Sequence, residues 1–175
     1  ANAIAMPSAS ISGVEVFNIK NVSGQTLALN MASIDGVTTL NSNMSTDTVN
    51  ITNIASGATG AVTGNGVVTN GASSFGYVAA ATSSTINIAG GTTAGNITVT
   101  GTGLLTQTIT STGAANTVGA IANSATVTDL NINATTALTT GAISGAALDT
   151  VTITGAGAVD LDAAALAATV GTVNA

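Results

Sequence analysis

The chain has 175 residues and a formal net charge of −6 at pH 7, with only 5% charged and 2% aromatic residues. It contains no His and no Cys, and its only basic side chain is Lys20. These counts exclude Ser-His-Asp and Cys-His catalysis. They also disfavour a nucleic-acid partner, because neutralising phosphates needs clustered Lys and Arg. We therefore expect a protein that is not an enzyme and that binds no nucleic acid.

The apolar fraction is 45% and the mean hydropathy is +0.56, which argues against disorder. The apolar residues are mostly small, so they predict a thin core. Thr, Val and Ile favour strands, while Gly, Asn and Ser favour turns. No apolar run approaches the roughly 18 residues of a membrane helix, and no signal-peptide pattern is visible. We expect no membrane insertion, and a chain that is cytosolic, a mature product, a fragment, or exported without an N-terminal signal.

In chain order, residues 1–10 form a leader of low periodicity, which we interpret as a linker. A repeat domain over 11–175 follows, beginning with ISGVEVFNIKNVSGQTLALN at Ile11. Fifteen segments in this domain are candidate strands: VEVFNI (14–19), TLALNM (26–31), VTTLNS (37–42), TVNITN (48–53), AVTGNG (61–66), YVAAAT (77–82), TINIAG (85–90), NITVTG (96–101), TQTITS (106–111), TVGAIA (117–122), VTDLNI (127–132), ALTTGA (137–142), TVTITG (150–155), VDLDAA (159–164) and TVGTVN (169–174).

From Thr85 to Thr169 the mean spacing of these segments is about 10–11 residues, which suits a sandwich, a barrel or a solenoid. Their similar composition, small side chains and recurring Asn and Thr favour an all-β, right-handed parallel β-solenoid (β-helix) of short Thr/Val/Ala/Asn/Gly-rich strands. The spacing predicts about 21 residues for a two-sided coil or about 32 for a three-sided one. The final TVGTVNA stops in mid-pattern, so we expect a piece of a longer protein.

Two stretches depart from the rhythm. Residues 61–82 hold Phe75 and Tyr77, two of the three aromatic residues, and are interpreted as a loop insertion on one face. Such a loop would either cover the core or contact a neighbouring molecule. DAAALAATV (162–170) is the one helical candidate, with Asp162 as its N-cap.

Calcium is the only candidate cofactor. Asp160 and Asp162 lie two residues apart and would share one face of a strand. Asp149 precedes Asp160 by eleven residues, and Asp129 lies a further twenty residues upstream. Carboxylates, Asn side chains and loop carbonyls are calcium ligands. The four Asp residues are therefore candidate calcium ligands, with solvated surface acids as the alternative, and Asp35 and Asp47 are weaker candidates.

Other motifs carry less chemistry. Lys20 is interpreted as a solvated residue near Glu15. GGTTAGNIT (90–98) lacks the Asp of the calcium-binding nonapeptide G-G-x-G-x-D-x-U-x. Thr-x-Thr occurs at Thr98/Thr100, Thr126/Thr128 and in two longer runs from Thr106 and Thr150. An ice-binding face would need one such pair per coil, and here the pairs cluster and skip.

The ISGVEVFNIKN stretch (11–21) resembles the SG[IV]E-x-[VLF]-N-[IVL] opening of repeat segments in bacterial surface-layer proteins of the Caulobacter and Campylobacter type. TVTDLNIN, LDTVTITGAGAVDLDAAAL and ATVGTVNA are similar to the Thr/Ala/Asn/Gly strand repeats of that group. The similarity covers most of 11–175 and is one of composition, which secreted adhesins share. The resemblance implies an extracellular, cell-surface β-solenoid, exported by type I secretion, that self-assembles into a lattice or filament, often with calcium.

We therefore expect a structural protein that forms a surface layer or filament through β-edge and solenoid-face contacts. Its partners would be copies of itself, with cell-surface polysaccharide as a second candidate. A stalk or passenger of a secreted adhesin is the alternative function, and an ice-binding solenoid is a minor one.

Overall fold

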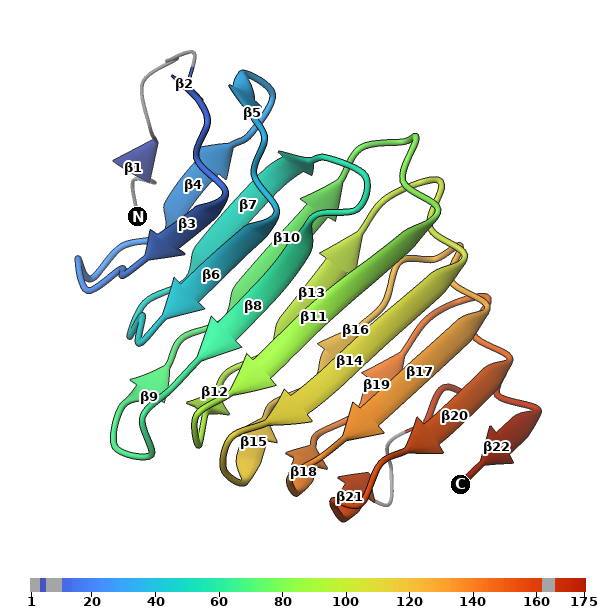
Figure 1. Cartoon of the computed structure of the whole chain (residues 1–175). Helices are drawn as coiled ribbons and strands as arrows, with labels where there is room; N and C mark the ends of the chain where they lie inside the picture. Colours follow the sequence, from blue (N-terminus) through green and yellow to red (C-terminus); the bar gives the residue numbers. More distant parts are fainter. Residues whose placement is uncertain (1–3, 6–10, 162–165) are drawn as a thin grey trace.

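The computed structural model describes residues 4–5, 11–161 and 166–175, which form a β-solenoid (Figure 1). The strand pairs are parallel, and the described residues contain no helix. The all-β, parallel-solenoid prediction is therefore confirmed.

Four sheets run along the solenoid, and each takes one strand from successive coils. Sheet C has the order β22 (Thr172–Asn174), β20 (Thr150–Thr154), β17 (Asp129–Ala134), β14 (Thr106–Thr112), β11 (Ser83–Ala89), β8 (Thr59–Thr63), β6 (Thr39–Asn43) and β3 (Val16–Ile19). Sheet A has the order β1 (Ile4–Ala5), β4 (Leu27–Asn30), β7 (Val49–Ile54), β10 (Ser73–Tyr77), β13 (Ile97–Thr100), β16 (Ile121–Ala122) and β19 (Ile143–Ser144).

Two smaller sheets complete the coils. Sheet D has the order β21 (Val159–Leu161), β18 (Leu138–Thr140), β15 (Asn116–Val118), β12 (Thr93–Ala94) and β9 (Thr69–Asn70). Sheet B pairs β2 (Ile11–Ser12) with β5 (Ile34–Asp35) in the first coils.

Each coil in the middle of the solenoid visits sheets C, D and A in turn. In Figure 1 the chain descends on the near sheet C and returns on the far sheet A while advancing toward the C-terminus, which makes the coil right-handed. Thr106 pairs with Ser83 and with Asp129, each 23 residues away. The coil length of 23 residues is close to the shorter of the two predicted values, about 21 residues. Each of these coils nevertheless contains three strands, because the strands of sheet D are only two or three residues long.

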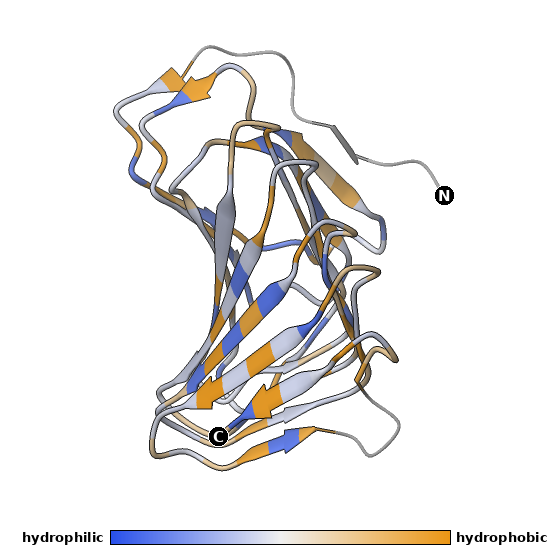
Figure 2. Cartoon of the chain, turned by 90° about the vertical axis from the view of Figure 1, so that its right-hand side faces the viewer, coloured by the Kyte–Doolittle hydropathy of each residue, from blue (hydrophilic) through white to orange (hydrophobic). Residues whose placement is uncertain are grey.

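Apolar side chains alternate with polar ones along the strands, and Figure 2 shows the resulting bands. On β11 and β14 every second residue is buried, which is the period of a strand with one face in a core. Like residues stack between coils, as in the buried column Ile86, Ile109 and Ile132. The core is a single thin layer between sheets A and C, filled mainly by Ile, Val and Leu.

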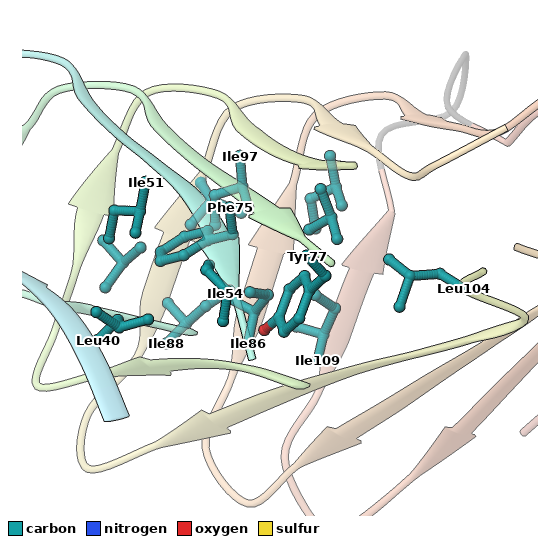
Figure 3. Packing of buried hydrophobic residues seen from close by; sticks show 14 of the residues in the cluster. Leu40, Ile51, Ile54, Phe75, Tyr77, Ile86, Ile88, Ile97, Leu104 and Ile109 are labelled. Carbon is teal, nitrogen blue, oxygen red and sulfur yellow. The ribbon is translucent and has the colours of Figure 1, made fainter. Parts of the chain in front are cut away.

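Residues 61–82 are not a loop insertion. They contain the end of β8, β9 and β10, and Phe75 and Tyr77 point into the core with 0% and 6% of their surface exposed. Figure 3 shows both rings among isoleucine side chains of the two main sheets. Gly60 makes the space, because a Cβ there would lie 2.7 Å from Phe75 Cδ1 and 2.6 Å from Ile86 Cδ1. The aromatic residues therefore broaden the core here and do not leave it.

The irregularity of this region lies in the length of its coils. Thr39 pairs with Thr59, 20 residues on, and Thr59 pairs with Thr85, 26 residues on. The additional residues fall in the turn after β8, where Val67 is 85% exposed. The turns absorb most of the difference in coil length, and sheet C keeps its register, while the pairing of β10 with β7 in sheet A shifts by one residue between Phe75 and Tyr77.

Two further expectations need correction. Within the predicted helix 162–170, Asp162 and its three successors lie outside the described residues, and Leu166 forms a parallel bridge with Ile143. The described part therefore continues sheet A and is not helical. Within the predicted linker 1–10, the described pair Ile4–Ala5 forms β1 and pairs with β4, so it belongs to the solenoid.

Candidate functional site

The calcium candidates lie on two different borders of the solenoid. Asp129 opens β17 and stands opposite Thr150, while Asp149 immediately precedes β20, so both lie exposed at the start of sheet C. Asp160 lies on β21 in sheet D and pairs with Thr139, beyond the other end of sheet C. A five-residue strand is about 16 Å long, so Asp160 is far from Asp129 and Asp149.

The local contacts of these acids are with their own chain. Asp129 Oδ2 accepts a hydrogen bond from Thr128 Oγ1 at 2.7 Å, and the Asp149 N–H donates to Thr128 O at 2.9 Å. Asp162 lies outside the described residues. Among the residues that the structure does describe, no group of three acidic, His or Cys side chains is placed to hold a metal ion. Calcium binding stays a prediction.

The weaker candidates have local roles. Asp47 Oδ2 accepts from the Gly24 N–H at 2.8 Å, which ties a turn of one coil to the preceding coil. Asp35 is exposed on the edge of sheet B, paired with Ser12. Lys20 and Glu15 are both exposed, as expected for solvated residues. None of these side chains lines a shared site.

Buried polar side chains hold the turns together instead. Asn116 is 1% exposed at the start of β15, and its Nδ2 donates to Ser111 Oγ at 2.9 Å and to Thr112 O at 3.2 Å. Its Oδ1 accepts from the Thr92 N–H of the previous coil at 2.8 Å. Asn21 is 4% exposed and likewise donates to two backbone carbonyls, those of Gln25 and Thr48. These amides satisfy turn backbone that the strand ladders leave unpaired.

We expect Asn116→Ala to lower the free energy of unfolding by about 1–3 kcal/mol, because it removes the acceptor of the buried Thr92 N–H and the hydrogen bond to the buried Ser111 Oγ. The exposed Asn133→Ala is the matched control and is expected to change the free energy by less than about 0.5 kcal/mol. Urea unfolding followed by far-UV circular dichroism measures both. Equal effects of the two substitutions would contradict the structural role of Asn116.

The sheet with the most strands among the described residues is sheet C, with eight, and its outer face is a candidate interaction surface. We call it the Thr/Asn face and define it by the solvent-facing positions Thr39, Asn41, Thr59, Thr85, Asn87, Thr108, Thr110, Asn131, Asn133, Thr152 and Thr154. Its columns are in register from coil to coil: Thr85 pairs with Thr108, and Thr108 with Asn131. The predicted ladders are present, since Asn41 Nδ2 donates to Asn18 Oδ1 at 2.9 Å and Thr110 Oγ1 donates to Asn87 Oδ1 at 2.5 Å.

The Thr-x-Thr pairs do not recur in every coil. Thr98/Thr100 lie on sheet A, and the coil of β17 presents Asp129, Asn131 and Asn133 between the Thr runs of β14 and β20. The Thr/Asn face is therefore a mixed hydroxyl and amide array. The groups at its defined positions are uncharged, and the exposed carboxylate of Asp129 lies at its border, so the chemistry available at the centre of the face is hydrogen bonding and close packing of small side chains.

No family model, curated protein or solved structure matches the chain. Within the described part of the chain, no helix of the length and apolarity needed to cross a membrane is found. The case for a function therefore rests on the chain's own surfaces.

Proposed function

We propose that the chain is a structural protein that assembles with copies of itself outside the cell into a layer or filament. The observation that supports this best is the parallel backbone ladder of sheet C, which stacks eight strands and can be extended by a further strand at either end. Among the described strands, β3 and β22 each have a partner on one side only. Unpaired N–H and C=O groups on such strands recruit another strand by β-augmentation.

The orientation of the β22 backbone is specific. The Thr172 N–H donates inward to Asp149 O at 3.1 Å. Successive residues of a parallel strand pair with opposite neighbours, so the Val173 N–H points away from β20. Val173 is also 49% exposed although its partner Val151 is fully buried. An additional strand stacked here would pair the free N–H and cover the valine.

The chemistry of the chain is in keeping with this proposal. The sequence has no His and no Cys, and the described residues group no three acidic side chains placed to hold a metal ion, which is in keeping with contacts as the proposed role of the surfaces. The resemblance of 11–21 to surface-layer repeats supports an extracellular location and export by type I secretion. A secreted adhesin stalk would use the same solenoid without self-association, and the experiment below separates the two.

Electron microscopy of the purified chain at neutral pH, with millimolar calcium and then with chelator, tests the proposal. We expect ordered layers or filaments. Val173→Pro removes the outward N–H and is expected to abolish end-to-end growth, because a proline at a sheet edge blocks further pairing. Val173→Thr, which keeps the N–H and a β-branched side chain, is the control that should still assemble.

The outcomes are distinct. Assembly only with calcium would make Asp129, Asp149, Asp160 and Asp162 the first targets for mutagenesis. Dispersed single particles in both conditions would overturn self-assembly and favour the adhesin stalk.

A further inference from the structure

We infer that the Thr/Asn face is the surface through which two copies of this chain pack side by side, sheet C against sheet C. This inference rests on the proposed function and names the lateral contact that an end-to-end ladder does not supply.

The charges of the chain lie away from the centre of this face. Between Asp47 and Asp129 the sequence has no charged residue, and this stretch supplies β8, β11 and β14, the central strands of sheet C. Asp129 and Asp149 lie at the border where β17 and β20 begin. Two copies with a net charge of −6 repel each other in general. Their Thr/Asn faces can nevertheless meet without burying a charge, which avoids the largest desolvation cost.

The side chains on the face suit close packing. Thr, Asn and Ala are short and lose little rotamer entropy when they are buried, unlike Lys or Glu. Thr110 and Asn41 are already held by hydrogen bonds to neighbouring coils, which orders the face before any contact. Hydroxyl and amide groups from an opposing copy can pair with each other, and the methyl groups of Thr can interdigitate.

Sheet C is also the broader of the two main sheets. Its strands β11 and β14 have seven residues each, whereas β16 and β19 on sheet A have two. Eight strands about 4.8 Å apart and about five residues wide give a face of roughly 600 Å². Two such faces bury roughly 1,200 Å² in total, which is the lower limit of specific interfaces. A contact of this size is weak alone and becomes firm when an array repeats it.

In this arrangement the Thr/Asn face of one copy packs against the Thr/Asn face of the other. A charge introduced at the centre of the face would therefore lie opposite the same charge on the second copy. The test is a charge pair at the centre, Thr85→Glu with Thr108→Glu, and its opposite, Thr85→Lys with Thr108→Lys. Both residues are half-buried on neighbouring strands and point outward, so the chain should fold. Ser74→Glu with Thr98→Glu places the same charges on the outer face of sheet A and is the matched control.

We expect each sheet C variant alone to raise the concentration needed for side-by-side assembly by at least about tenfold, with end-to-end growth retained. A 1:1 mixture of the Glu and Lys variants should restore lateral assembly, because opposite charges then face each other. The sheet A control should assemble as the unmodified chain does. Electron microscopy and sedimentation velocity give the readouts, and circular dichroism verifies folding.

Unchanged lateral assembly of both sheet C variants would overturn this inference and leave the proposed function standing. Loss of assembly in the sheet A control, or no recovery in the mixture, would also overturn it. Absence of any assembly by the unmodified chain would instead overturn the proposed function. Particles that stay single but bind polysaccharide or ice would assign the Thr/Asn face to those ligands and overturn the inference.

Discussion

Replacing Phe75 by alanine is expected to lower the free energy of unfolding by about 3–5 kcal/mol. Phe75 on β10 is the largest of the fully buried side chains among the described residues. Its ring packs between sheets A and C, so truncation leaves a cavity that rigid ladders on both sides prevent from closing (Figure 3). Guanidinium unfolding followed by far-UV circular dichroism measures the change.

Two variants sharpen this prediction. Ser74→Ala alters the half-exposed neighbour on the same strand and is expected to change the free energy by less than about 0.5 kcal/mol. Gly60→Ala places a Cβ 2.7 Å from Phe75 Cδ1 and is expected to cost about 1–3 kcal/mol in the unmodified chain. In the Phe75→Ala background the close contact with the ring is absent and only the contact with Ile86 Cδ1 at 2.6 Å remains, so the cost of Gly60→Ala should fall. Additive effects would show that Gly60 and Phe75 do not share a cavity.

The second large effect is a loss of stability at alkaline pH. Burial of the phenol raises the pKa of Tyr77 from 10.0 to about 12. Below pH 10 the folded and unfolded chains both hold the proton. Between pH 10 and 12 the unfolded chain releases it while the folded chain retains it, so stability falls by about 1.4 kcal/mol per pH unit, roughly 3 kcal/mol in total.

The chain suits this measurement, because Tyr77 is its only tyrosine and it has no tryptophan. Tyrosinate absorbance therefore reports a single group, and it should appear near pH 12 in the folded chain and near pH 10 in urea. Tyr77→Phe is the control, and it is expected to remove the tyrosinate signal and to flatten the stability profile between pH 10 and 12. A folded-state transition near pH 10 would contradict the burial of the phenol.

Much of the fold could be predicted from local pattern. Thirteen of the fifteen predicted segments share at least three residues with a single strand, because Thr, Val and Ile alternate with polar residues there. TVGAIA (117–122) instead covers parts of two short strands, β15 and β16, and YVAAAT (77–82) shares only Tyr77 with β10. In β10, Ser73, Ser74 and Gly76 are neither β-branched nor aromatic, so their strand conformation comes from pairing with β7 and β13 and not from propensity.

The prediction of a loop insertion over 61–82 was wrong for a physical reason. Two aromatic rings do not fit a core of small side chains unless the position that faces them has no side chain. Gly60 supplies that space from the opposite sheet. Sequence spacing gives no sign that Gly60 and Phe75 face each other, because the coil that joins them has an unusual length. The two-residue strands of sheet D were missed for a similar reason, since periodicity needs more residues than they have.

The candidate sites, like the fold, could be predicted from the sequence only in part. The sequence grouped Asp149 with Asp160 as candidate calcium ligands, but eleven residues is about half a coil, so Asp149 lies just before β20 of sheet C and Asp160 on β21 of sheet D. The Thr/Asn face was only partly visible, because counting Thr-x-Thr alone omits Asn131 and Asn133, which occupy the same columns. Knowledge of the 20–26-residue coil would have aligned those positions.

Because the turns of the solenoid vary in length, such a chain can change in length without disturbing the pairing of its strands. A coil contacts the coils on either side of it, and its turns accept additions such as those before Val67 without a change of register. Duplication of a whole coil in the gene would then give a longer solenoid with the same cross-section, adding about 4.8 Å for each copy. The length of the solenoid can thus change in steps of one coil, while the contacts between the existing coils stay the same.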